Sequence, residues 1–326
     1  GDVYKRQLRT LTVIRDAEAA IQKKDPSFSI QKLDYDDAAT YKMLGQGETE
    51  GVFQLESSGM KQVLVGLQPQ NLEDVIALIS LYRPGPMDSI PTYLRNRHEP
   101  DKISYKTPQL AHILDVTNGC IVYQEQVMQI FRELAGFSFG QADNVRRAMS
   151  KKKHAVMEAE REHFVHGCTE PGHECPGCVA NGISEKVANE IYDEMSSFAS
   201  YAFNKSHAAC YAYVAFQTAY LKCHYPSEFM AALLTSVLDN TDKVIEYSGE
   251  CARLGIKVLP PDVNISNGGF TADNGKIRFG LNAVKNVGRN LIERVVEERQ
   301  EEPYSSLYDF CKRMHGTELN LSLIHI

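Results

Sequence analysis

Five cationic side chains fall within eight residues of this chain. The run contains no acidic residue and comprises Arg146, Arg147, Lys151, Lys152 and Lys153. Arginine offers paired N–H donors to phosphate oxygens, and lysine adds point charges. If residues 141–153 form one helix, Arg147 and Lys151 share a face, where like charges repel each other until an anion binds. The run indicates a phosphate-binding surface, with a solvated charged face as the alternative.

A second polar segment has the composition of a phosphate site at the start of a helix. Residues 203–207 read Phe-Asn-Lys-Ser-His, and Tyr211 follows one turn later. Asn204 and Lys205 stand where the free amides of a helix N-terminus bind anions. His207 can donate to an oxyanion, and Tyr211 offers a stacking surface for a base. We predict one wall of a nucleotide-binding cleft; a polar helix cap with a structural His and a core Tyr is the alternative.

Three of the eight cysteines cluster with a histidine in ligand spacing. Cys168, Cys175 and Cys178 enclose His173, and Pro-Gly separates the last two cysteines. Such a set suits a tetrahedral Zn²⁺ site, which would be structural because four protein ligands leave no open position. The alternative is a surface loop with incidental thiols. The other cysteines are scattered, so a disulfide framework is not expected.

Residues 280–292 have the pattern of a hairpin between two helices that binds the DNA backbone without reading sequence. Lys285, Gly288 and Arg289 are its candidate DNA contacts. Asn286 stands where such hairpins usually carry the first glycine, which is tolerable because asparagine can adopt the left-handed conformation. A purely structural hairpin is equally compatible with this pattern.

The bulk composition is that of a globular protein, with 326 residues, 43% hydrophobic and 24% charged. The net charge of −7 means that a nucleic acid would have to be held by local cationic patches. We find no run of eighteen apolar residues and no signal peptide, so we expect a soluble, cytoplasmic protein without membrane contacts.

Hydrophobic periodicity predicts a mainly α fold with a small β-hairpin toward the C-terminus. We expect a turn at the two prolines after Arg83, a strand at 258–261, and a hairpin over 270–279 around Asp273-Asn274-Gly275. Helices are predicted at residues 8–25, 38–44, 51–60, 72–82, 121–135, 141–153, 183–197, 206–223, 228–238, 243–254, 291–298 and 306–314. Ser138 and Gln141 have the spacing of a capping box for the helix that carries the cations.

The two ends of the chain are related through their codons. Residues 2–7 can be encoded by GATGTGTATAAGAGACAG, and the reverse complement of that strand encodes residues 321–326. The pair resembles a translated transposon end from a sequencing library. We therefore expect residues 1–7 and 321–326 to be adapter-derived, and residues 8–320 to be an internal fragment of a longer protein.

Several long motifs resemble the C family of bacterial replicative DNA polymerases, the family of the DNA polymerase III alpha subunits. They are VFQLESSGM at 52–60, LYRPGPM at 81–87, IVYQEQVMQI at 121–130, ADNVRRAMSKKK at 142–153, the segment 203–234 and KVLPPDVN at 257–264. They follow the order of the family and span essentially residues 8–320. The resemblance implies a palm edge and connector at 8–50, a multi-helix fingers domain at 51–255 with a Cys/His-rich insert at 166–182, and the start of a helix-hairpin-helix region at 256–320.

The resemblance also implies roles for the residues above. Arg146, Arg147 and Lys151 would face the triphosphate of an incoming dNTP. Asn204, Lys205, His207 and Tyr211 would flank the nascent base pair and its phosphates. Gln54 and Arg83 are further candidates for the cleft.

In the family, a primer 3′-hydroxyl attacks the α-phosphate while two Mg²⁺ ions on palm aspartates stabilise the reacting oxygens. By resemblance those aspartates lie before Leu8, so we expect no primer extension by this chain alone. The implied partners are primer-template DNA, dNTPs, the sliding clamp and other replicase subunits. An error-prone or PolC-type paralogue and a non-catalytic nucleic-acid-binding module are the alternatives.

Overall fold

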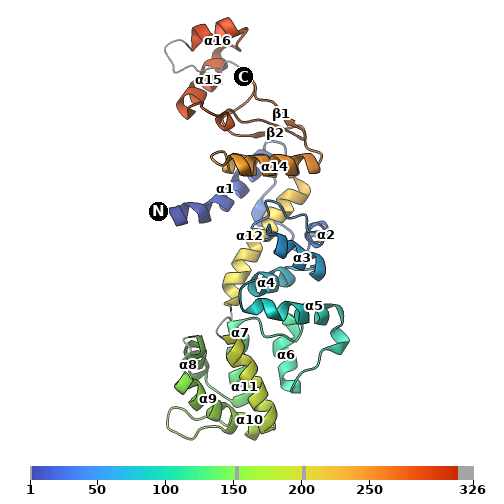
Figure 1. The fold of residues 1–326 in the computed structure, drawn as a ribbon, viewed down its shortest axis with the longest axis vertical. Helices are drawn as coiled ribbons and strands as arrows, with labels where there is room; N and C mark the ends of the chain where they lie inside the picture. Colours follow the sequence, from blue (N-terminus) through green and yellow to red (C-terminus); the bar gives the residue numbers. More distant parts are fainter. Residues whose placement is uncertain (1, 151–153, 200–202, 315–326) are drawn as a thin grey trace. The chain divides into compact units, whose positions relative to one another are not determined.

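The computed structural model describes residues 2–150, 154–199 and 203–314, which form two compact units. Unit 1 comprises Gly1–Met43, Glu48–Glu56 and Val214–Ile326, and unit 2 comprises Leu44–Gly47 and Ser57–Tyr213. Two helices, α2 (Ala38–Gly45) and α12 (Lys205–His224), contribute residues to both units. The fold is mainly helical, as predicted (Figure 1).

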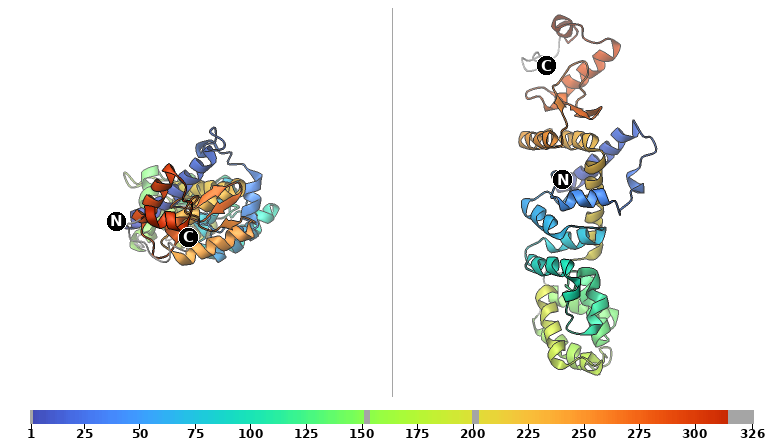
Figure 2. Two further views of the ribbon diagram at one scale, coloured as in Figure 1. Left: turned by 90° about the horizontal axis from the view of Figure 1, so that it is seen from above. Right: turned by 90° about the vertical axis from the view of Figure 1, so that its right-hand side faces the viewer.

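Unit 1 is built from helices that pack on a small sheet. Its remaining helices are α1 (Asp2–Gln22), α13 (Pro226–Ser236), α14 (Thr241–Arg253), α15 (Arg289–Glu301) and α16 (Leu307–Arg313). The first helix packs against α13 although most of the chain separates them (Figures 1 and 2). Val13, Ile14, Ala17 and Ile21 form the buried stripe of α1, which has the expected helical spacing.

The sheet of unit 1 has three short strands in the order β1-β3-β2. Strand β1 (Val258–Leu259) pairs parallel with β3 (Lys276–Arg278), and β2 (Thr271–Asp273) pairs antiparallel with it. Asn274 and Gly275 connect β2 to β3 with φ of +48° and +77°. Both residues are left-handed, as a two-residue hairpin turn requires. The predicted hairpin is confirmed.

Unit 2 is entirely helical apart from isolated bridges among its described residues. Its helices are α3 (Ser58–Leu67), α4 (Leu72–Leu81), α5 (Ile90–His98), α6 (Ala111–Leu114), α7 (Gln124–Ala135), α8 (Phe139–Ser150), α9 (His154–His166), α10 (Gly177–Ala180) and α11 (Glu185–Ala199). Helices α7 to α11 pack together around Phe131, Phe164 and Tyr192 (Figure 2, green). These rings contact one another edge to face or tilted, which adds to the stabilisation from their burial.

Local signals locate most helix ends. Ser138 N donates to Gln141 Oε1 at 2.7 Å and Gln141 N donates to Ser138 Oγ at 3.3 Å, which confirms the capping box before α8. The helix α4 ends at Leu81, and a 3₁₀ turn, Pro86–Ser89, follows the Arg-Pro-Gly-Pro segment. Further 3₁₀ turns cover Ile30–Lys32, Pro100–Lys102, Pro108–Leu110, Asp115–Thr117 and Leu281–Ala283.

The helix predicted from residue 51 is wrong at its start. Residues 51–57 form turns, and α3 begins only at Ser58 after its N-cap Ser57. Gly51 has a φ of +75° and Gln54 a φ of +63°, and neither value belongs to a helix. Residues 121–123 are likewise extended, because Tyr123 pairs with Phe203 in a parallel bridge. The bridge between Tyr123 and Phe203 joins segments far apart in the sequence, which local hydrophobic periodicity cannot reveal.

Helices α5, α6, α9 and α10 were not predicted. In the described part of the chain, no helix combines the length and the apolar character needed to cross a membrane.

Candidate nucleotide site

The two arginines of the cationic run share one carboxylate. Arg146 donates to Asp143 Oδ1 through Nε at 2.9 Å and Nη2 at 2.7 Å, and Arg147 Nε lies 2.8 Å from Asp143 Oδ2. These pairs join residues three and four apart on α8, which face the same side of the helix. The hydrogen bond from Arg146 is the main reason why the pKa of Asp143 lies below its ordinary value. Asp143 therefore stays ionised and holds both guanidinium groups on one face.

The two arginine side chains differ in exposure and in how many hydrogen bonds hold them. The side chain of Arg146 is 21% exposed and also donates to Gln124 Oε1 at 3.0 Å, so it is fixed between α7 and α8. The side chain of Arg147 is 65% exposed. A phosphate would reach Arg147 directly, while Arg146 is already oriented. Lys151 lies outside the described residues.

The segment Phe203–His207 lies beside the start of α7. Gln124 N donates to Phe203 O at 2.9 Å, and Glu125 accepts from Asn204 Nδ2 at 2.9 Å and from Lys205 N at 3.1 Å. Asn204 Oδ1 in turn accepts from His207 N at 3.0 Å. The first amides of α12 are thus already capped. A phosphate at these amides would have to displace Glu125.

The side chains of this segment form an aromatic row. The ring of His207 lies between Phe203 and Tyr211, with centroid distances of 5.3 and 4.6 Å. The guanidinium of Arg83 lies 4.0 Å from the centroid of Phe203, within the range of cation–π attraction. His207 is exposed and Tyr211 half-buried. Arg83 and His207 both contact Phe203, and Tyr211 contacts His207, so these side chains lie in one row of unit 2.

Lys205 has a different role from the one its charge suggests. Its Nζ lies 3.0 Å from Glu73 Oε2 and 5.2 Å from the ring centroid of Tyr123. This cation therefore already has an acidic partner.

A pocket of about 570 Å³ joins the two predicted segments in unit 2. Arg146 and Asn204 both line it, and α7 supplies Gln124 and Glu125 between them. Its volume lies within the range of small-ligand sites. The sequence did not lead us to Asp143 and Glu125. Asp143 pairs with the two arginines of α8, and Glu125 accepts hydrogen bonds from Asn204 and Lys205. The spacing of Asp143 before the two arginines was the available signal.

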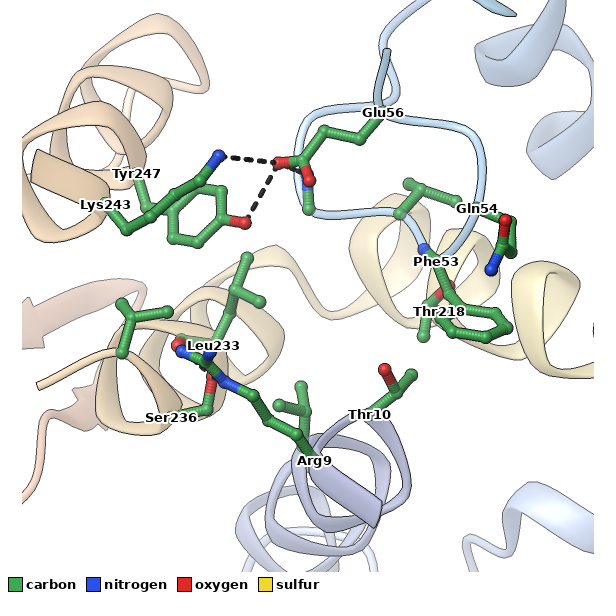
Figure 3. A pocket seen from close by; sticks show the side chains of 14 residues that line it. Arg9, Thr10, Phe53, Gln54, Glu56, Thr218, Leu233, Ser236, Lys243 and Tyr247 are labelled. Atoms are coloured by element: carbon green, nitrogen blue, oxygen red, sulfur yellow. Dashed lines mark hydrogen bonds and ion pairs between the residues drawn. The ribbon is translucent and has the colours of Figure 1, made fainter. Parts of the chain in front are cut away.

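Gln54 belongs to unit 1 and lines a different pocket there (Figure 3). The structure thus groups Arg83, Arg146, Arg147, Asn204, Lys205, His207 and Tyr211 within unit 2.

The predicted zinc site is wrong. The described residues include all four proposed ligands, and among these residues no group of three or more His, Cys, Asp or Glu side chains could hold a metal ion. Cys168 and Cys175 pair through their backbones, with N–H···O distances of 2.9 Å in both directions. They and Cys178 are buried in the apolar core of unit 2, whereas His173 is exposed.

Burial explains what the thiols do instead. It raises the pKa of Cys178 to about 12 and also raises the pKa of Cys175. Buried thiols with a raised pKa stay protonated and pack as small apolar side chains. The Cys/His spacing therefore reflects a tight β-bridged loop that closes onto the core.

The hairpin candidates lie on the surface of unit 1. Asn286 has a φ of +62°, which confirms that this asparagine takes the left-handed position. Gly288 is the N-cap of α15 with a φ of −74°, and a Cβ there would meet nothing within 4 Å. Lys285 is exposed, and Arg289 pairs with the exposed Asp239 at 3.0 Å. Open space around Gly288 and the start of α15 leaves room for a phosphate.

Two family models match parts of the chain. Residues 10–172 match the family model described as the bacterial DNA polymerase III alpha subunit finger domain. Residues 255–325 match that of a helix-hairpin-helix motif.

Similar proteins include subunits of the same name from three bacteria. The chain is 43% identical over 318 residues to the DNA polymerase III subunit alpha of Bacillus subtilis, covering 97% of this chain and 28% of that protein. The values are 48% over 320 residues for Thermus aquaticus, covering 96% and 25%, and 46% over 308 residues for Chlamydia pneumoniae, covering 94% and 24%. The chain spans about a quarter of the length of these relatives.

Proposed function

The chain belongs to the family of bacterial DNA polymerase III alpha subunit finger domains, and we propose that it holds the triphosphate of an incoming dNTP during template-directed DNA synthesis. The observation that carries this proposal is the arginine pair of α8, which Asp143 orients on one face. Preorganised donors that need no rearrangement are what phosphoryl transfer requires of a binding surface.

The proposed nucleotide site combines the pocket that Arg146 and Asn204 line with two groups that do not line it, Arg147 and the aromatic row. Arg147, whose guanidinium is largely exposed, donates to the phosphate oxygens, and Arg146, which already donates to Asp143 and Gln124, adds positive charge beside it. His207 and Tyr211 offer ring faces to the base. Asn204 lines the pocket beside Arg146. The aromatic row and the arginine pair thus supply complementary parts of one nucleotide site.

Mg²⁺ would neutralise the charge that develops on the transferred phosphoryl group in the complete enzyme. Residues 2–150, 154–199 and 203–314 contain no cluster of three or more His, Cys, Asp or Glu side chains suited to a metal ion. We therefore assign no metal ligand and no metal-dependent step to this chain. Its own residues bind and orient the triphosphate.

Unit 1 contributes contacts to the DNA backbone in this proposal. Lys285 is exposed beside the left-handed Asn286, and Gly288 leaves the amides at the start of α15 open to a phosphate. Arg289 can exchange its exposed partner Asp239 for a phosphate, because a surface ion pair is weak. Primer-template DNA is the partner we propose for these residues. The sliding clamp, other replicase subunits and a cytoplasmic location are proposals for the complete protein.

Removing Arg147 tests the triphosphate site. We expect Arg147→Ala to weaken the binding of a fluorescently labelled dATP by about tenfold, because charge-assisted hydrogen bonds contribute about 1.5–3 kcal/mol each. The stability of the chain should hardly change, since this side chain is 65% exposed. Titration of the chain with the labelled nucleotide measures the affinity, and urea unfolding checks the fold.

Arg95→Ala is the matched control, because Arg95 is an exposed arginine of unit 2 that lies on a different helix, α5. Equal affinities for the two variants would contradict the proposal. So would full binding by an Arg146→Ala/Arg147→Ala double variant that remains folded.

A further inference from the structure

The clustered cysteines of unit 2 are a group of reactive side chains that the nucleotide site does not use. Cys168 follows α9, Cys175 precedes α10 and Cys178 lies on that short helix. All three are reduced and buried, in the apolar core that surrounds Phe131. Residues 169–174, which connect the first two cysteines, are exposed. The loop therefore has a tip in solvent and two thiols at its base.

Cys168 and Cys175 face each other directly across the base of this loop. The backbone N of each residue donates to the backbone O of the other at 2.9 Å. In such a hydrogen-bonded antiparallel pair the Cα atoms lie about 5.5 Å apart, and disulfides usually span about 4.4–6.8 Å between Cα atoms. Opposed residues also direct their side chains to the same face. The backbone of the reduced loop thus already has the separation that a disulfide requires.

Two glycines bring the two sides of the loop base together. Gly167 and Gly177 have φ values of +87° and +78°, which glycine adopts without strain. A Cβ on Gly167 would stand 2.6 Å from Cys175 O, and a Cβ on Gly177 would stand 2.3 Å from Gly167 N. No side chain fits at either position. The segments that carry the two thiols therefore approach backbone to backbone before any oxidant arrives.

Closing the disulfide needs only a small further movement. The Cβ atoms of opposed residues lie about 4.5–5.5 Å apart, and those of a disulfide about 3.5–4.5 Å apart, so the two side chains must approach by about 1 Å. Cys168 and Cys175 form an isolated bridge and not a longer ladder. A shift of this size therefore moves chiefly the exposed tip of the loop.

Cys178 is the competing partner for Cys175. Burial raises the pKa of Cys178 to about 12, and the nearby Cys175 adds to the rise. Access separates the candidates, because Cys168 and Cys175 are 9% and 7% exposed whereas Cys178 is 0% exposed. A small oxidant can therefore reach the bridged pair at the edge of the core, but not Cys178.

We propose that Cys168 and Cys175 are a reversible redox pair, which a low-molecular-weight disulfide such as oxidised glutathione converts to a disulfide across the base of the loop. One thiolate attacks a sulfur of the small disulfide, whose S–S bond breaks and releases one small thiol. The other thiolate attacks the resulting mixed disulfide and releases the second small thiol. The protein loses two protons and two electrons, and the small disulfide gains them. This inference does not depend on the proposed nucleotide site.

The disulfide should stabilise unit 2. The loop joins α9 to α10, and Asn181 Nδ2 after α10 donates to Leu134 O of α7 at 2.8 Å. A covalent bond across a short loop lowers the entropy of the unfolded chain, so the midpoint of thermal unfolding should rise by about 5 °C on oxidation. The reaction should be slow, because burial raises the pKa of Cys175 and the thiolate is the attacking form.

The test incubates the whole folded chain with oxidised glutathione, blocks the remaining thiols and maps the disulfides by mass spectrometry. A protease that cleaves after glutamate cuts at Glu170 and Glu174, so only a disulfide can join the peptides of Cys168 and Cys175. We expect a joined pair that is two hydrogens lighter than its reduced peptides, with fragmentation locating the bond at Cys175. Dithiothreitol should reverse the cross-link and the thermal shift. The exposed Cys210 reports that the oxidant is active, by forming a mixed disulfide.

Three variants assign the pair. Cys175→Ser should abolish the cross-link, and Cys178→Ser should retain it. Cys251→Ser is the matched control, because Cys251 is a buried thiol of unit 1, and it should also retain the cross-link.

Two results for the unaltered chain would overturn the proposal, whether or not the variants fold. One is a disulfide between Cys175 and Cys178 in place of the expected one. The other is a pair that stays reduced while Cys210 reacts. Loss of the cross-link in a folded Cys178→Ser variant would overturn it as well.

Discussion

Single side chains decide how the charged residues of this protein act. Arg146 and Arg147 are neighbours in the sequence, but one is held by Asp143 and Gln124 whereas the other is largely exposed. The environment of Lys222 differs even more from what its charge and position in the sequence suggest. Lys222 stands in the last turn of α12 and yet has no exposed side-chain surface. Its Nζ donates to two backbone carbonyls and lies 2.6 Å from Glu250 Oε1.

Replacing Lys222 should destabilise unit 1 strongly. Burial lowers the pKa of Lys222, but three acceptors surround its ammonium group. We expect Lys222→Met to reduce the free energy of unfolding by about 3 kcal/mol, because it leaves buried acceptors without their donor. Urea unfolding followed by circular dichroism measures the change. Lys102→Met is the control, since the pair of Lys102 with Glu99 is exposed and should contribute less than about 1 kcal/mol. A loss for Lys222→Met no larger than for this control would reject the prediction.

Asp37 should make stability depend on pH. Burial alone would raise its pKa, but hydrogen bonds from Thr40 and His224 outweigh burial and hold the pKa below the ordinary 3.8. The native state therefore binds fewer protons than the unfolded state. The stabilisation that ionised Asp37 contributes is complete above pH 3.8 and is lost as the pH falls through the pKa of Asp37 in the native state.

Two substitutions separate the charge of Asp37 from its cap on α2. Asp37→Asn can still accept from Thr40 N, so its deficit at pH 7 should vanish below pH 3.8. Asp37→Ala also loses the cap and should lose about 1 kcal/mol more at every pH. Urea unfolding at several pH values measures both. A deficit of Asp37→Asn that is constant with pH would contradict the assignment.

At the scale of elements, short-range signals and backbone conformation decide where segments start and turn. The capping box of Ser138 and Gln141 and the Asn274-Gly275 turn were both readable in the sequence. Tertiary contacts decided the ends of other elements, such as the start of α3. Residues 51–57 do not continue a helix, because Phe53 N donates to Thr218 Oγ1 of α12 and Lys222 of the same helix holds Glu50 O just before them.

The left-handed position of Asn286 gives a test of the hairpin before α15. Asn286→Ala should destabilise the chain by about 1 kcal/mol, because alanine has a larger penalty in this region. Asn286→Gly should be tolerated much better, since glycine adopts this conformation freely. Thermal and urea unfolding measure the two variants. A glycine variant less stable than the alanine variant would reject the left-handed backbone as the cause of the loss.

At the scale of the whole molecule, charge is organised in patches. The net charge is −7, so the overall field opposes a polyanion, and only local cations such as Lys285 and Arg289 can hold DNA. Binding that depends on a few phosphate contacts should be highly sensitive to salt.

The salt dependence of DNA binding tests this arrangement. We expect the logarithm of the binding constant to fall against the logarithm of KCl concentration with a slope of about −3, as for three or four phosphate contacts. Lys285→Ala should make the slope less steep by about 1, because it removes one contact. Anisotropy titrations of a labelled duplex from 50 to 200 mM salt measure it. An unchanged slope for Lys285→Ala would exclude Lys285 as a phosphate contact.

The sequence by itself determined the mainly helical fold, the β-hairpin, the left-handed Asn286 and the two segments of the proposed nucleotide site. All of these depend on local periodicity, on turn chemistry or on long motifs. Only the tertiary structure decided which charges are free, because ion partners such as Glu73 for Lys205 come from distant elements. It also decided that Cys168, Cys175 and Cys178 pack in the core while His173 is exposed, so that these four described residues form no metal-ligand cluster. Ligand spacing specifies residue types, whereas burial and side-chain direction depend on how the helices pack.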